Sequence, residues 1–232
     1  MRSPFMRGVA HGIPIMLGYL SVSFGFGIMA VRLGLPAFGA VAISLTNLTS
    51  AGQAAGVEIV AAGGTLLEMA LTQLIINLRY ALMGFSLSQK LDGTFNTRRR
   101  LLVSFGITDE IYGVAISQSE RLTARYMYGL ILMPVLGWTG GTALGALAGE
   151  LLPQALSNAM GIVLYGMFMA IIIPASRKDK RVLLVVVLAA VFSCLCKFSL
   201  PMVSSGFAVI ISALLASLVG ALVCPLGEEE LS

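Results

Sequence analysis

The sequence is short of charged residues. Only 11% of its 232 residues are Asp, Glu, Lys or Arg, whereas a typical soluble domain carries about 25%. With so few charges the chain cannot cover a water-exposed surface, which excludes an ordinary soluble globular protein and indicates lipid as its solvent. The net charge of +4 does not indicate a nucleic-acid-binding protein, because the basic residues lie in short loops between apolar stretches.

Histidine and cysteine are scarce as well. The single histidine, His11, leaves no plausible Ser–His catalytic pair and no His-Glu-x-x-His metal site. The chain has three cysteines, an odd number, and all lie in apolar surroundings. We therefore expect the cysteines to be small buried hydrophobic residues and to form no disulfide framework. The chain also has no Walker-type glycine loop. These absences predict that the protein is not an enzyme, binds no metal or cofactor, and does not itself use ATP.

Long apolar stretches fill the chain instead. Because a helix needs about 20 apolar residues to cross a membrane, they predict an all-α integral membrane protein with about six to eight transmembrane segments, some broken or re-entrant. We expect one polytopic transmembrane transporter domain over residues 1–232. The candidate segments are residues 13–33, 38–62, 65–88, 101–118, 125–149, 157–175, 182–201 and 206–226.

Lysine and arginine predict the orientation of these segments. Most of them lie in four places: Arg2 and Arg7; Lys90 with Arg98, Arg99 and Arg100; Arg121 and Arg125; and Arg177, Lys178, Lys180 and Arg181. The positive-inside rule puts all these groups on the cytoplasmic side. Strictly alternating spans cannot do so. All four basic groups can lie on the cytoplasmic side if residues 38–62 and 101–118 each enter and leave the membrane on the same side. One re-entrant segment with seven spans is an alternative.

The first of these two segments contains a polar run, Asn47-Leu48-Thr49-Ser50-Ala51-Gly52-Gln53, that suits a broken helix. Glycine permits left-handed backbone, Ser and Thr can cap a half-helix, and the N-terminus of a half-helix attracts a carboxylate. Discontinuous helices bind substrates near the midplane of known transporters. The residues of this run that we expect to contact an amino acid substrate are Asn47, Ser50, Gly52 and Gln53. Ordinary helix packing by small polar residues is the alternative.

Ionisable groups also lie inside apolar stretches, where charges are costly and usually face a protein-lined or wet interior. We expect Asn77 and Arg79 to contact the substrate, with Arg79 binding its carboxylate or an acidic partner. Asp109 and Glu110 are adjacent carboxylates that repel one another, so one of them can exchange a proton, as proton coupling requires. The alternatives are an ion pair that only fixes two helices, and a position near the surface where both acids stay hydrated.

Two further residues have simpler interpretations that involve no substrate. Glu68 lies near the start of residues 65–88, and we expect it to reach the membrane interface. Trp138, the single tryptophan, is either an interfacial anchor or a core residue.

Five motifs in the first half of the chain occur together in a characteristic order and spacing. They are Gly12-Ile13-Pro14-Ile15-Met16-Leu17-Gly18-Tyr19, Phe24-Gly25-Phe26-Gly27, Ser50-Ala51-Gly52-Gln53, Asn77-Leu78-Arg79-Tyr80-Ala81-Leu82-Met83-Gly84 and Thr108-Asp109-Glu110. Together they resemble the AzlC family of branched-chain amino acid permeases. The resemblance implies the large subunit of a two-component exporter for leucine, isoleucine, valine and methionine. It also implies a small membrane partner of the AzlD type, with the proton gradient as energy source.

We therefore expect a multi-pass exporter of branched-chain or similarly apolar amino acids in the cell inner membrane, coupled to protons. The alternatives are a channel for small solutes or ions and a membrane scaffold that transports nothing. A channel would show flux without a proton requirement. A scaffold would gain no heat stability from any amino acid, because only a bound ligand stabilises the folded state.

Overall fold

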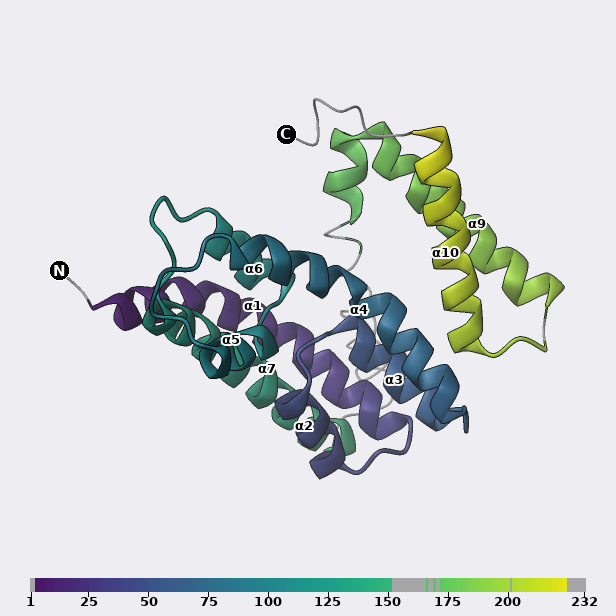
Figure 1. Ribbon diagram of the computed structural model, residues 1–232. Coiled ribbons are helices and arrows are strands. Elements are labelled where there is room, and N and C mark those ends of the chain that lie inside the picture. Colours follow the sequence, from purple (N-terminus) through teal and green to yellow (C-terminus); the bar gives the residue numbers. More distant parts are fainter. Residues whose placement is uncertain (1–2, 152–165, 167–168, 170–171, 201, 225–232) are drawn as a thin grey trace. The chain divides into compact units, whose positions relative to one another are not determined.

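The computed structural model describes residues 3–151, 166, 169, 172–200 and 202–224, and this part of the chain is helical (Figure 1). Within it, 5 helices are long and apolar enough to cross a membrane: α1 (Pro4–Arg32), α4 (Leu66–Ser88), α7 (Ala124–Leu151), α9 (Lys180–Ser199) and α10 (Ser205–Val223). The shorter helices are α2 (Ala37–Thr46), α3 (Ala51–Ala61), α5 (Thr97–Phe105) and α6 (Asp109–Ile116). The predicted all-α membrane fold is confirmed. The predicted segment 157–175 lies mostly outside the described residues.

The described helices belong to two compact units. The first contains Met1–Val57 and Ile76–Leu164, and the second contains Glu58–Ile75 and Tyr165–Ser232. The first half of α4 therefore belongs to the second unit and its second half to the first. The expected single transporter domain over residues 1–232 stays a prediction.

The first unit is built on α1 and α7, which pack closely and run in the same direction (Figure 1). Gly8 lies against the backbone of Leu130, and Gly27 lies against that of Ala146. The N-terminal part of α1 therefore contacts the N-terminal part of α7, and the C-terminal part contacts the C-terminal part. The glycines of α7 whose added Cβ would collide with α1 are Gly129, Gly137, Gly141 and Gly145. Small residues allow such close approach between helices in a membrane.

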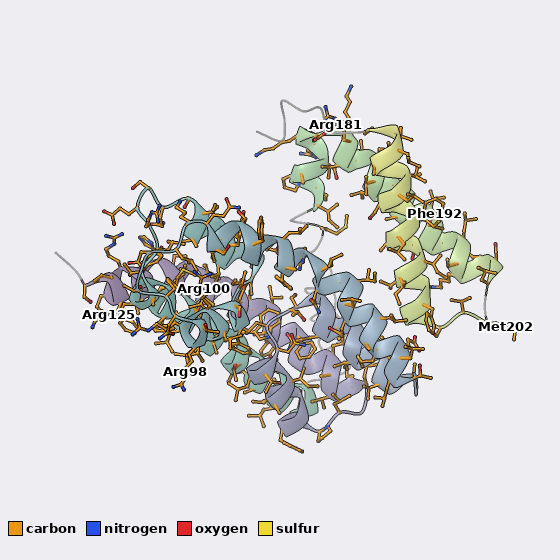
Figure 2. The ribbon with its side chains drawn as sticks, in the orientation of Figure 1. Arg98, Arg100, Arg125, Arg181, Phe192 and Met202 are labelled. Atoms are coloured by element: carbon orange, nitrogen blue, oxygen red, sulfur yellow. The ribbon has the colours of Figure 1, made fainter. Side chains whose placement is uncertain are left out.

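Basic residues gather at the end of the first unit where α1 begins. Arg7 forms an ion pair with Glu120 at 3.2 Å, and the Lys90 ammonium donates to the carbonyl oxygens of Ile116 and Gln118. Figure 2 labels Arg98, Arg100 and Arg125 around the same end. The basic groups of this unit therefore share one side, as the positive-inside rule predicts. The remaining basic group, after residue 176, lies in the second unit.

Residues 37–61 form a helical hairpin that enters from the opposite end. α2 stops at Asn47, whose backbone is extended, and α3 begins at Ala51. Val57 of α3 and Ala40 of α2 share one buried cluster near the ends of α1 and α7 that lie farthest from the basic loops. The segment thus enters and leaves on one side, as predicted.

Residues 97–116 form a second hairpin, which enters from the basic side. α5 ends at Gly106 and α6 begins after Thr108, whose hydroxyl accepts a hydrogen bond from the Ile111 N–H at 3.4 Å. The end of α6 returns to Lys90, beside the start of α5. Each predicted re-entrant segment is thus a helical hairpin whose two ends lie at the same end of the first unit. That both re-enter the membrane, and not one alone with seven spans, stays a prediction. The second hairpin begins at residue 97, not at residue 101.

The second unit contains the antiparallel pair α9 and α10 and the beginning of α4. Glu68 is only 3% exposed and accepts hydrogen bonds from the Ser204 hydroxyl and, at 3.0 Å, from the Gly206 N–H. The expectation that Glu68 reaches the interface is wrong, because the first N–H groups of α10 offer its carboxylate donors and a favourable dipole inside the protein. Cys196 is buried as expected, whereas Cys194 is exposed.

Candidate substrate site at the hairpin tips

The tips of the two hairpins meet at one aromatic pair, Tyr19 of α1 and Trp138 of α7. The ring centroids lie 5.2 Å apart in an edge-to-face arrangement. Leu48, in the break between α2 and α3, packs in the same buried cluster. The Tyr19 hydroxyl is hydrogen-bonded at 2.6 Å to Thr108, in the break between α5 and α6. Tyr19 therefore contacts both breaks, which enter the unit from opposite sides.

Buried hydrogen bonds fix the first tip to α7. The Trp138 Nε1–H donates to Gln53 Oε1 at 2.7 Å, and Gln53 Nε2 donates to Ser44 Oγ at 3.2 Å. Ser44 in turn bonds the Thr142 hydroxyl at 2.7 Å. Trp138 is therefore a core residue. Because Gln53 is only 2% exposed and its amide joins α2, α3 and α7, this geometry favours a holding role, and its contact with substrate stays a prediction.

The break itself contains unusual backbone and unsatisfied hydroxyls. Ser50 has φ +49°, a left-handed conformation that costs a non-glycine residue about 1 kcal/mol or more. Asn47 Oδ1 accepts the Thr49 N–H at 3.1 Å, and the Gly52 N–H donates to the Thr49 carbonyl at 3.2 Å. The buried hydroxyls of Thr49 and Ser50 form no hydrogen bond within the described part of the chain. They directly precede α3, whose first N–H groups favour an anion.

At the second tip Arg79 pairs with Asp109. The distance from Arg79 Nη1 to Asp109 Oδ2 is 2.8 Å, and the two side chains are 43% and 35% exposed. The same guanidinium donates to the Tyr80 hydroxyl at 3.2 Å and lies 5.0 Å from the centre of its ring. The predicted acidic partner of Arg79 is therefore Asp109.

Glu110 has a different partner from its neighbour Asp109. The Tyr19 O–H donates to Glu110 Oε2, while the Thr108 hydroxyl can donate to the Tyr19 oxygen. Glu110 therefore bonds a neutral hydroxyl, whereas Asp109 bonds a cation. The two adjacent acids have different partners.

The structure thus sorts the predicted residues into two groups. Asn47, Ser50, Gly52 and Gln53 lie at the first tip, and Arg79, Asp109 and Glu110 lie at the second. Asn77 lies on α4, on a different face from Arg79 because residues two apart on a helix point in nearly opposite directions. The roles of all these residues stay predictions.

Sequence reasoning missed Tyr19 and Thr108 as members of the site. A threonine directly before two acids is a helix-capping signal, so Thr108 could have been recognised as the start of a half-helix. Tyr19 offered no such signal, because its position in an apolar helix does not indicate which loops contact it.

Comparison with known proteins identifies the family. A family model described as AzlC protein matches residues 14–152, more than half of the chain. The chain belongs to the AzlC family. The AzlC match includes both hairpins, Arg79 and the Tyr19–Trp138 pair.

Relatives of this AzlC-family chain cover most of its length. The inner membrane protein YgaZ of Escherichia coli (strain K12) is 28% identical over 204 residues, 85% of this chain and 83% of the relative. An uncharacterized membrane protein of Archaeoglobus fulgidus is 30% identical over 73% of this chain and 75% of the relative. The branched-chain amino acid transport protein AzlC of Bacillus subtilis (strain 168) is 24% identical over 76% and 70%. No solved structure matches the chain.

Proposed function

We propose that this AzlC-family protein is a transporter, not an enzyme, and exports branched-chain or similarly apolar amino acids across the cytoplasmic membrane with the proton gradient as energy source. The observation that carries the proposal is that two broken, re-entrant segments meet at Tyr19 between α1 and α7. The name of the Bacillus subtilis relative supports the substrate class, and that of the Escherichia coli relative supports the inner membrane as location.

The substrate carboxylate binds at the first tip. Thr49 and Ser50 bring buried hydroxyl donors without a partner in the described residues, directly before the N-terminus of α3. Helix N-termini with unpaired donors are ready-made anion sites, and half-helices serve this purpose in transporters. Gly52 is buried within the first turn of α3, where the absence of a side chain allows a small ligand to approach the backbone closely.

The apolar side chain of the substrate packs beside the aromatic pair. Ile15, Val22 and Val135 are partly buried against the cluster of Tyr19, Leu48 and Trp138. Aliphatic and aromatic walls with a few placed polar groups are typical of small-molecule sites. This composition fits leucine, isoleucine or valine better than a polar amino acid.

The second tip recognises the ammonium group and carries the proton. Asp109 pairs with Arg79 at 2.8 Å, while Glu110, hydrogen-bonded to Tyr19, carries the exchanged proton. Because Tyr19 contacts both tips, its movement away from Glu110 would open the path between them. The ion pair is partly exposed, so its direct worth to stability is small, which favours a functional over a purely structural role.

The chain acts as the large subunit of a two-component permease, together with a small membrane subunit of the AzlD type. The family resemblance supports this arrangement. Counterflow measured with and without the small subunit shows whether export needs it.

Counterflow of radiolabelled leucine in proteoliposomes tests the proposal, with this chain alone and with its small partner. We expect saturable leucine exchange that responds to an imposed pH gradient, and a loss of at least about tenfold in the Asp109→Asn, Glu110→Gln double variant, as for other catalytic proton-transfer groups. The matched control is Glu120→Gln, an exposed acid outside the hairpin tips. Equal flux from wild type and a folded double variant would remove the coupling mechanism, and unsaturable flux would indicate a channel.

A further inference from the structure

A second site lies on the first unit, away from the hairpin tips. An apolar groove of about 250 Å³ runs between the last turns of α4 and the hairpin helix α5. Leu87 and Val103, which are 2% and 3% exposed, belong to the buried cluster beneath it, while Gly84 and Phe95 line its sides. The groove is open to the surroundings of the protein and is too apolar to hold a polar metabolite.

The groove has a basic residue at its rim. Arg100 lines it together with the hydroxyl side chains Ser88, Thr97 and Ser104. Arg98 and Arg99 adjoin Arg100 on the same helix without lining the groove. The mouth therefore lies at the basic, cytoplasmic end of the unit.

The charge at this mouth has no acidic counterpart on its own helix. The first turn of α5 contains no acidic residue, although the N-terminus of a helix already carries a partial positive charge. Three consecutive arginines there repel one another and the helix dipole. A nearby acid, Asp92, is engaged by the Thr94 N–H at 2.9 Å. An external anion at this position would relieve the repulsion.

We infer that this groove binds an anionic phospholipid of the cytoplasmic leaflet, with an acyl chain between α4 and α5 and its phosphate at Arg100. An apolar groove with a cationic rim at the cytoplasmic surface matches the two halves of such a lipid, and basic pockets at this depth bind anionic headgroups. A zwitterionic lipid matches the groove but not its charge. The bound lipid packs against α5, one arm of the cytoplasmic hairpin, and so steadies the second tip.

Native mass spectrometry of the purified full chain tests the inference, with phosphatidylglycerol and phosphatidylcholine of identical acyl chains as probes. We expect one tightly bound phosphatidylglycerol. Arg100→Gln is expected to weaken its binding about fivefold, the contribution of one basic residue near a charged headgroup. Gly84→Leu is expected to abolish binding of this lipid, because its side chain fills the groove; a Cβ at Gly84 meets no atom within 4 Å, so the fold should persist.

Two matched controls keep the result interpretable. Gly18→Leu is the same change in α1, also with no atom within 4 Å of the added Cβ, and Arg125→Gln removes a basic residue of the same end that does not line the groove. Both should bind phosphatidylglycerol like the wild type. Equal affinity for both lipids, or unchanged phosphatidylglycerol binding by a folded Gly84→Leu protein, would overturn the inference.

Discussion

Tyr19 is the residue on which the proposed path depends most. Its hydroxyl bonds Glu110 and Thr108, whereas its ring packs on Trp138. Tyr19→Phe keeps the ring and removes only the hydroxyl. We expect leucine counterflow to fall at least about tenfold, and the free energy of unfolding to fall by about 1 kcal/mol, because the partly buried Glu110 loses its donor.

Tyr112→Phe is the matched control for Tyr19. It also removes a hydrogen-bonded hydroxyl, here 2.9 Å from Ser86 Oγ, but from α6, the hairpin helix that contains Glu110. Counterflow should then stay near the wild-type rate. A Tyr19→Phe protein that exchanges leucine as fast as Tyr112→Phe would show that the hydroxyl has no part in transport.

A second prediction at the level of single residues concerns the ion pair of Arg79 and Asp109. Arg79→Gln leaves Asp109 without a cation and should lower stability by about 1 kcal/mol, a modest value because both side chains are partly exposed. Adding Asp109→Asn should recover most of this loss, because no uncompensated charge remains. Thermal unfolding of the two single variants and the double variant measures the coupling energy, and strictly additive losses would contradict a direct pair.

At the scale of elements, the contact of α1 with α7 depends on which glycines face it. A Cβ on Gly141 would collide with the backbone of Leu20 and with Ser23, whereas a Cβ on the adjacent Gly140 meets no atom within 4 Å. Gly141→Ala should therefore destabilise the protein by about 1–3 kcal/mol. Gly140→Ala should be neutral or stabilising by up to about 1 kcal/mol, because alanine is the better helix former.

The comparison is made by thermal unfolding of the two variants in the same detergent. They differ by one position in one helix, so expression and detergent effects cancel. Equal shifts of the unfolding temperature would mean that α1 and α7 do not approach as closely as their glycines indicate.

The two hairpins were the most predictable elements. Basic residues on both sides of residues 101–118 required that segment to return to its starting side, and the polar run from Asn47 to Gln53 located the other break. Which helices the tips contact was not predictable. Helical periodicity defines only where a side chain lies around its own axis, so Gln53 was assigned to substrate although Trp138 and Ser44 engage its amide.

At the scale of the whole molecule, topology gives the most direct test. With both hairpins re-entrant, the loop between α4 and α5 faces the cytoplasm and the loop between α3 and α4 faces outward. In a background without its native cysteines, Gly93→Cys should react with an impermeant maleimide only in inverted membrane vesicles. Ala62→Cys should react only in right-side-out vesicles, and both residues are exposed.

The cysteine-free background itself provides the control, because it should not be labelled in either orientation. Reversed labelling, with Ala62→Cys reacting only in inverted vesicles and Gly93→Cys only in right-side-out vesicles, would mean that residues 38–62 cross the membrane. Labelling of both positions from the same side would mean that α4 does not cross it. The position of Gly93 is open, with no atom within 4 Å of an added Cβ, so this substitution should not disturb the loop.

Composition and charge placement alone determined that the chain is a helical membrane protein and which stretches are helical, and they predicted that two of these stretches return to the side they entered. These properties follow from the cost of charges and unpaired backbone groups in hydrocarbon, which depends on local sequence. Only the tertiary structure decided that Tyr19 joins the two tips, that Asp109 and Glu110 have different partners, and that Glu68 caps α10. These contacts join residues far apart in the chain, and packing between helices, which no single segment specifies, brings them together.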